Sequence, residues 1–190
     1  MAIVLASQSP RRQELLARIG VEDFKTLSLD IDESYPEGLS PEDTVRYIAK
    51  KKCDAAAALC APDDLIITAD TMVFLGNDRL GKPRDEEDAL RMLRELAGRG
   101  HTVCTGVSVR CGETSELFAV STRVFFRPMT DDEIRAYIKT GEPMDKAGAY
   151  GVQSRGALFV ERIDGDFFNV MGLPVEQLGL VLARFGVKLL

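Results

Sequence analysis

The chain of 190 residues has no tryptophan, a single histidine and no apolar run near the roughly 18 residues that a membrane span requires. One histidine excludes a His-rich metal site and makes a carboxylate the expected general base. Ser–His catalysis would have to use His101, which follows Gly98-Arg99-Gly100 at the start of a predicted strand and has no motif partner nearby. This position argues against such a mechanism.

Cysteines are few, and their spacing carries no metal or redox motif. None of Cys53, Cys60, Cys104 and Cys111 forms a Cys-x-x-Cys pair, and each lies in an apolar helical or strand setting, so we expect buried free thiols. The start Met1-Ala2-Ile3 carries no basic n-region, and we therefore expect no secretory signal and a cytoplasmic protein.

A basic excess is absent as well. The net charge of −6 argues against a nucleic-acid polymer as partner, although it permits a local basic pocket for a small polyanion. Hydrophobic residues at 45% and charged residues at 28% are typical of a globular protein, and we expect no membrane as a partner. We expect one domain over residues 1–190, or one domain with a smaller lobe, with enough chain for a substantial core.

The first segment combines a predicted strand, a turn and a helix. Residues 3–6 form an apolar run of strand length, small polar residues follow, and Ser9 and Pro10 suit the N-cap and the first position of a helix. Arg11 and Arg12 then fall in the first turn, where the helix dipole already creates a positive field. A bound phosphate would offset this field, because N–H groups and guanidinium groups both match phosphate oxygens. The alternative is that both arginines pair with carboxylates elsewhere in the chain.

A strand predicted over residues 24–29 runs into an acidic segment that contains Asp30, Asp32 and Glu33. On a loop such a run is usually just solvated, and the segment by itself favours that interpretation.

The next helix is predicted to start at Ser40 and to end before Pro62. Lys52 follows Ile48 by four residues and Ala49 by three, so it shares their inward face. Its ammonium either reaches an interior pocket or extends past the apolar stripe to solvent.

An acidic residue interrupts the most apolar predicted strand. Residues 65–69 form a buried strand, Asp70-Thr71 follows, and the apolar run then resumes. Because an unpaired buried carboxylate costs several kcal/mol, we expect Asp70 to face a pocket, a metal or a cation. A hairpin turn at 76–78 returns the chain to Lys82, which can therefore end near Asp70.

The rest of the chain mainly predicts structure. In order, we expect a helix started by the acids of 85–88, a hairpin over 101–126, a capping box at 130–133, an irregular Gly-rich segment at 145–153, a strand over 156–163 and a helix over 175–185. The Gly-rich segment would let a ligand approach the backbone closely. Because helices and strands alternate early and a β-rich part follows, the sequence predicts an α/β fold around a mixed, twisted sheet flanked by helices.

The charged residues singled out above agree in chemistry. Glu33 and Asp70 suit a hard divalent cation, Mg²⁺ or Mn²⁺, which one or two carboxylates hold together with phosphate oxygens and water. Lys52, Lys82 and the turn at Arg11-Arg12 suit a polyphosphate. Phosphoryl chemistry needs little more than positioning, charge neutralisation and a carboxylate that orients or deprotonates water.

Several motifs, in this order along the chain, resemble those of the Maf family, nucleoside triphosphate pyrophosphatases once described as septum-formation inhibitors. The motifs cover nearly the whole chain: Ser7-Gln8-Ser9-Pro10-Arg11-Arg12, Ala69-Asp70-Thr71, Gly81-Lys82-Pro83, Gly141-Glu142-Pro143, residues 145–151, and Phe168-Asn169-Val170-Met171-Gly172-Leu173-Pro174.

The resemblance implies a Maf/ITPase-like fold with a central cleft, two lobes around it, and a possible homodimer. It also implies a cytosolic, metal-dependent hydrolase that cleaves a nucleoside triphosphate between the α and β phosphates. The family's proton-accepting acid falls on Asp70. Its other polar active-site positions are the following: Ser7, Arg12, Glu33, Lys52, Lys82 and Gln153.

Substrate choice is also suggested by the resemblance. The branch acting on dTTP and UTP is similar in carrying Arg12, Thr71 and Gln153 at its specificity positions. The amide of Gln153 offers a donor and an acceptor, which suits a pyrimidine edge. We expect Arg12 to contact substrate, while Arg11 supports the turn.

Two alternatives remain at this point. A non-catalytic nucleotide-binding regulator of septum formation and cell division would need the phosphate site but neither a base nor metal-binding acids, and the presence of Glu33 and Asp70 favours the enzyme. A house-cleaning enzyme whose substrate is a modified pyrimidine nucleotide has the same sequence features as one acting on dTTP.

Overall fold

The computed structural model describes all residues from 1 to 190, and the chain divides into two compact units. Unit 1 comprises Met1–Asp70, Thr105–Val120 and Gly172–Leu190, whereas unit 2 comprises Thr71–Cys104 and Ser121–Met171. No helix has the length and apolar character that crossing a membrane would demand.

Seven strands form one mixed sheet. They are β1 (Ile3–Leu5), β2 (Phe24–Thr26), β3 (Leu65–Leu75), β4 (Asp78–Leu80), β5 (Gly100–Cys111), β6 (Thr114–Phe126) and β7 (Val160–Asp164). The strand order is β2-β1-β3-β5-β6-β7, with β4 paired to β3. Strand β1 is parallel to β2 and β3, whereas β4 and β7 are antiparallel to β3 and β6. The predicted α/β fold with a mixed sheet is therefore confirmed.

Six α-helices accompany the sheet. They are α1 (Pro10–Arg18), α2 (Pro41–Ala57), α3 (Glu86–Leu96), α4 (Asp131–Ile138), α5 (Phe167–Met171) and α6 (Val175–Arg184). Local capping starts three of them as predicted, because the side chains of Ser40, Asp85 and Thr130 each accept a hydrogen bond from the backbone N–H three residues later.

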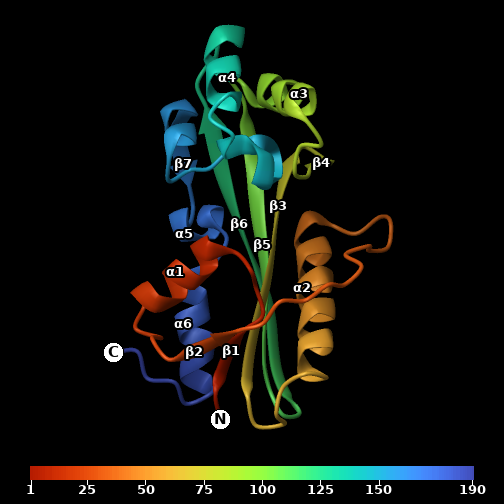
Figure 1. The fold of residues 1–190 in the computed structure, drawn as a ribbon, viewed down its shortest axis with the longest axis vertical. Coiled ribbons are helices and arrows are strands. Elements are labelled where there is room, and N and C mark those ends of the chain that lie inside the picture. The colour runs from red at the N-terminus through yellow and green to blue at the C-terminus, as the bar shows by residue number, and fades with distance from the viewer. The chain divides into compact units, whose positions relative to one another are not determined.

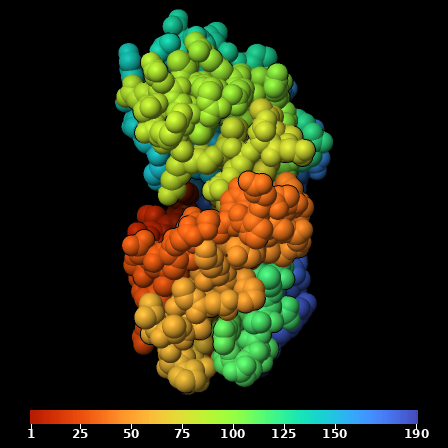
Figure 2. Space-filling view, turned by 90° about the vertical axis from the view of Figure 1, so that its right-hand side faces the viewer, coloured from red at the N-terminus to blue at the C-terminus, as the bar shows by residue number.

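Within unit 1, α2 runs along one side of the strands, and α1 and α6 lie on the other side (Figure 1). Helix α2 and the segment before it lie on the face of unit 1 that Figure 2 turns to the viewer, together with the green hairpin of β5 and β6. Two contacts hold α2 against the sheet. Thr68 of β3 donates a hydrogen bond of 2.7 Å to the carbonyl of Ala49. Gly106 of β5 lies so close to α2 that an added Cβ would stand 2.3 Å from the carbonyl oxygen of Val45.

Within unit 2, His101 is a core residue. Its Nε2 lies 2.8 Å from the hydroxyl of Tyr150, and its ring packs edge-on against Phe126. Burial lowers the pKa of His101 to about 4, so the imidazole is neutral near pH 7. A structural role explains this histidine, in line with the argument against Ser–His catalysis.

The structure corrects several local predictions. Strand β2 ends at Thr26 rather than at residue 29, because its parallel partner β1 ends at Leu5. Residues Arg155–Phe159 form a 3₁₀ helix, and the strand begins only at Val160. The reason is that the backbone N–H groups of residues 155 and 156 donate hydrogen bonds to the carboxylate of Glu142. The short helix α5 was not predicted. Of the four free thiols, Cys53 and Cys104 are buried as expected, whereas Cys60 and Cys111 are partly exposed.

The contact between β5 and α2 leads to a test of stability. We expect Gly106→Ala to lower the free energy of unfolding by about 2 kcal/mol, because the added methyl group meets backbone atoms that cannot rotate away. Gly179→Ala in α6 is the matched control, because its Cβ would meet only Leu189 at 3.7 Å and alanine favours a helix. Urea unfolding of both variants measures the difference, and equal midpoints would contradict the tight packing of α2.

Candidate active site

Three charged side chains of unit 1 form the centre of the site. The Lys52 ammonium lies 2.7 Å from Oδ1 of Asp70 and 2.8 Å from Oε1 of Glu33. The side chains of Lys52 and Asp70 are 14% and 9% exposed, whereas that of Glu33 is 50% exposed. The alternative in which Lys52 extends to solvent is therefore wrong, and the expectation that Asp70 faces a cation is confirmed.

The contact of α2 with β3 brings Lys52 to Asp70. Thr68 and Asp70 are two residues apart on β3 and so point to the same face of the sheet. Thr68 binds the carbonyl of Ala49, and Lys52 follows Ala49 by three residues, on the same side of the helix. This role of Thr68 was not predicted from the sequence, although a polar residue within an apolar strand is a visible signal.

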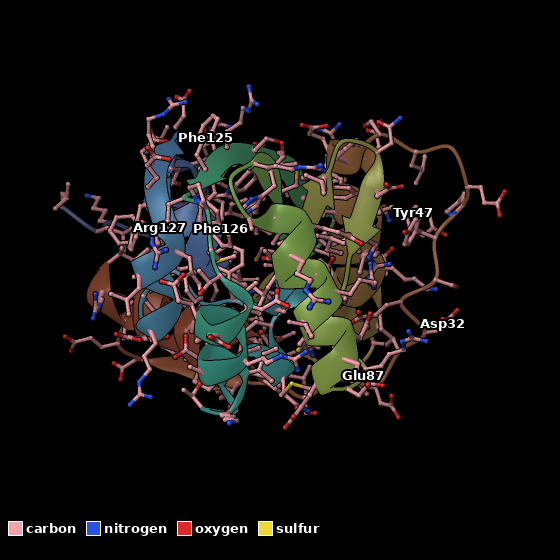
Figure 3. The ribbon with its side chains drawn as sticks, turned by 90° about the horizontal axis from the view of Figure 1, so that it is seen from above. Asp32, Tyr47, Glu87, Phe125, Phe126 and Arg127 are labelled. Atoms are coloured by element: carbon pink, nitrogen blue, oxygen red, sulfur yellow. The ribbon has the colours of Figure 1, made fainter.

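The acidic segment before α2 is ordered by a neighbouring lysine. Asp32 accepts hydrogen bonds from the backbone N–H and the hydroxyl of Ser34, and Lys51 donates to both residues. Asp32 lies on the loop at the outer edge of Figure 3, and the hydrogen bond from the Ser34 hydroxyl lowers its pKa. This turn leaves the next acid, Glu33, directed at Lys52. The interpretation of a merely solvated run is therefore wrong for Glu33.

Arg12 connects the start of α1 to the strand that carries Asp70. Its Nε donates to the carbonyl of Gly172 at 2.8 Å, and its NH1 donates to the carbonyl of Ala69 at 2.9 Å and to Oγ of Ser7 at 3.3 Å. Burial lowers the pKa of Arg12, and the negative charge of Asp70 opposes this shift. The guanidinium thus lies within electrostatic reach of the carboxylates of Asp70 and Glu33.

The turn before α1 differs from the predicted cap. Ser9 occupies the N-cap position, but its side chain makes no capping bond. Its backbone N–H instead donates to Oγ of Ser7 at 3.3 Å. Ser7 therefore shapes the turn that holds Arg11 and Arg12 in the first turn of α1.

One oxygen of the central carboxylate lacks a protein partner. Oδ2 of Asp70 is buried and accepts no hydrogen bond. Buried polar atoms are nearly always satisfied, so this oxygen is open to a bound water, cation or substrate. No cluster of three or more His, Cys, Asp and Glu side chains could hold a metal. The carboxylates of Asp70 and Glu33 are of the ligand type that a hard cation uses together with water and substrate oxygens.

Three further predicted site residues belong to unit 2. Thr71 follows Asp70 on β3, Lys82 is exposed on the turn between β4 and α3, and Gln153 is exposed on the loop before β7. Gly148 donates a hydrogen bond of 3.1 Å to the carbonyl of Gly81, which joins the Gly-rich segment before Gln153 to the turn of Lys82. The approach of Lys82 to Asp70 stays a prediction.

The fold and the site together define an α/β protein with a charged site just beyond the carboxyl end of a parallel strand, β1, where open sheets bind their ligands. The chain belongs to the Maf family: the family described as Maf-like protein matches residues 2–185.

Relatives agree with this assignment, and one solved structure is similar in fold. A dTTP/UTP pyrophosphatase of Bacillus velezensis is 46% identical over 98% of this chain and 97% of the relative. One of a Geobacillus species is 47% identical over 97% of this chain and 98% of the relative. The structure of a HAM1 protein from Coxiella burnetii is similar in fold, with a TM-score of 0.53 and 12% identity over 97% of this chain and 99% of that one.

The buried charge cluster gives a second stability test. We expect Lys52→Met to lower the free energy of unfolding by about 3 kcal/mol, because it leaves the Asp70 carboxylate without its cation. Asp70→Asn in the same chain should recover most of the loss. The control is Lys50→Met, two residues earlier in α2, whose exposed pair with Asp54 is worth less than about 1 kcal/mol. Equal effects of the two lysine substitutions would contradict the arrangement.

Proposed function

We propose that this protein hydrolyses dTTP and UTP to the nucleoside monophosphate and pyrophosphate. The observation that carries the proposal is the buried carboxylate of Asp70, which has one oxygen on Lys52 and one without a partner. The names of the relatives, dTTP/UTP pyrophosphatase, support the choice of substrate. A protein that only binds nucleotides would have no use for a second acid, Glu33, at the same ammonium.

A divalent cation, Mg²⁺ or Mn²⁺, completes the proposed site. Glu33 and Asp70 would hold it, because hard cations prefer carboxylate oxygens. When bound, the ion would neutralise charge on the phosphate oxygens and polarise the reacting phosphorus.

The protein's own residues then carry the remaining steps. Asp70 accepts the proton of the attacking water, and the water oxygen forms a bond to the α phosphorus. The bond from the α phosphorus to the oxygen that bridges the α and β phosphates breaks, so that pyrophosphate leaves with this oxygen. Lys52 pairs with Asp70 and offsets charge on the phosphates. Ser7 and Arg12 offer donors to phosphate oxygens at the start of α1, where the helix dipole favours an anion.

Lys82 contributes a further cation for the polyphosphate in this proposal. Thr71 and Gln153 contact the base, and the Gln153 amide offers one donor and one acceptor to a pyrimidine. We propose the cytoplasm as the compartment, because four free thiols fit a reducing environment.

The first test is a substrate panel. With Mg²⁺ or Mn²⁺, the purified protein is expected to release pyrophosphate from dTTP and UTP much faster than from ATP or GTP, and modified pyrimidine nucleotides in the same panel define the preferred base. Chelation by EDTA should abolish the release. Equal rates on all nucleotides, or orthophosphate as the first product, would contradict the proposal. Tight binding without turnover would favour the regulator instead.

The second test separates catalysis from binding. Asp70→Asn should lower kcat by at least about 100-fold, because an amide cannot accept the proton, while the dissociation constant for dTTP measured without metal changes little. Isothermal titration with dTTP and a pyrophosphate assay measure the two quantities. The control is Asp54→Asn on the exposed side of α2, which should leave both unchanged. Retained turnover in Asp70→Asn would remove this residue from the role of base.

A further inference from the structure

Glu142, from the Gly141-Glu142-Pro143 motif, is the centre of a hydrogen-bond cluster in unit 2. Its Oε1 accepts from the hydroxyls of Tyr137 at 2.8 Å and Ser154 at 2.5 Å, and from the backbone N–H of Gly156 at 3.2 Å. Its Oε2 accepts from the backbone N–H of Arg155 at 3.2 Å. Three of these four donors belong to the segment directly after Gln153.

The segment before Gln153 is tied to the same carboxylate. The backbone N–H of Gly151 donates a hydrogen bond of 3.1 Å to the hydroxyl of Tyr137, and this hydroxyl donates in turn to Glu142. Val152 is buried, whereas Gln153 is exposed. Both ends of the short loop that carries Gln153 therefore converge on one side chain.

The two ends of this loop also touch each other without spare room. A Cβ on Gly156 would stand 2.5 Å from the carbonyl oxygen of Gly151, and one on Gly151 would stand 2.9 Å from Cε of Lys146. The Lys146 ammonium donates to the carbonyl of Glu142 at 2.7 Å, which closes the base of the loop. A closed base leaves few conformations for the residues between.

The charge of the cluster suits this arrangement. Burial raises the pKa of Glu142, but hydrogen bonds from Ser154, Tyr137 and the backbone outweigh this effect and lower it overall. Burial raises the pKa of Tyr137, so its hydroxyl remains a donor. An ionised acceptor surrounded by donors makes charge-assisted hydrogen bonds, which are about twice as strong as neutral ones.

We propose that Glu142 is a positioning residue that gives this protein its preference for pyrimidine nucleotides, by holding the loop of Gln153 in one conformation. The inference rests on the proposed function, in which Gln153 contacts the base. An amide discriminates between bases only when its donor and acceptor are held within about 0.5 Å of one geometry. A loosened loop would let the same amide adapt to a purine, so selectivity would fall before turnover does.

The test is a double-mutant cycle with Glu142→Gln and Gln153→Ala. Glu142→Gln keeps the size of the side chain but replaces one carboxylate oxygen with an NH₂ group. At the Oε2 position this group would face the N–H of Arg155, so that two donors oppose each other. We expect it to lower the ratio of kcat/KM for dTTP over ATP about tenfold, mainly through KM for dTTP. In the Gln153→Ala chain the same substitution should have no further effect on the ratio. Glu161→Gln, on the exposed face of β7, is the matched control and should leave the ratio unchanged.

Amide hydrogen exchange supplies a readout that needs no activity. In Glu142→Gln, the amides of Gly151, Arg155 and Gly156 should exchange at least about tenfold faster than in the wild type, while those of β3 keep their rates. Unchanged exchange overturns the inference, and so does an effect on selectivity that persists without Gln153. A wild-type protein that releases no pyrophosphate overturns the proposed function instead, and the exchange experiment still decides whether Glu142 holds the loop.

Discussion

The ion pair between Lys52 and Asp70 is the interaction on which the rest of unit 1 depends. A carboxylate as buried as that of Asp70 is costly to keep ionised without a cation, and Lys52 supplies one at 2.7 Å. The same ammonium also contacts Glu33, so both acids are ion-paired to one lysine. Oδ2 of Asp70 remains an acceptor that the protein itself does not satisfy. An apolar pair of the same volume would pack as well, so stability alone does not explain these charges.

The backbone around Asp70 is held from two sides. Thr68 bonds to the carbonyl of Ala49 on α2, and the carbonyl of Ala69 accepts from Arg12 of α1. Thr68 and Ala69 of β3 thus hold α2 and α1, which lie on opposite faces of the sheet. Asp70 is the next residue of the strand, so its backbone is fixed by both contacts. The close approach of Gly106 to α2 belongs to the same arrangement, because it brings the helix near enough for Lys52 to reach the strand. The position of the charged site is therefore a consequence of helix packing.

Sequence reasoning succeeded where the signal is local. The caps at Ser40 and Thr130 depend on residues three apart, and Asp70 was found because a charge inside an apolar strand needs an explanation. It failed where a side chain acts across the chain. Glu142 takes N–H groups from residues 13 and 14 positions later, which turns a predicted strand into a 3₁₀ helix. No periodicity or cap in the segment itself reveals a partner that lies in another motif.

The two arginines of α1 show how a structure refines an electrostatic argument. Their position against the helix dipole allowed a bound anion or pairing with carboxylates, and the structure adds backbone carbonyls as partners of Arg12. Carbonyls hold the guanidinium in place without cancelling its charge. Arg12 and Lys52 therefore stand as two cations beside two acids, Asp70 and Glu33, with both of which Arg12 interacts electrostatically. This balance affects how the proposed substrate binds. A metal ion alone is repelled by the cations and a triphosphate alone is repelled by the acids, whereas the two together satisfy both sets of charges.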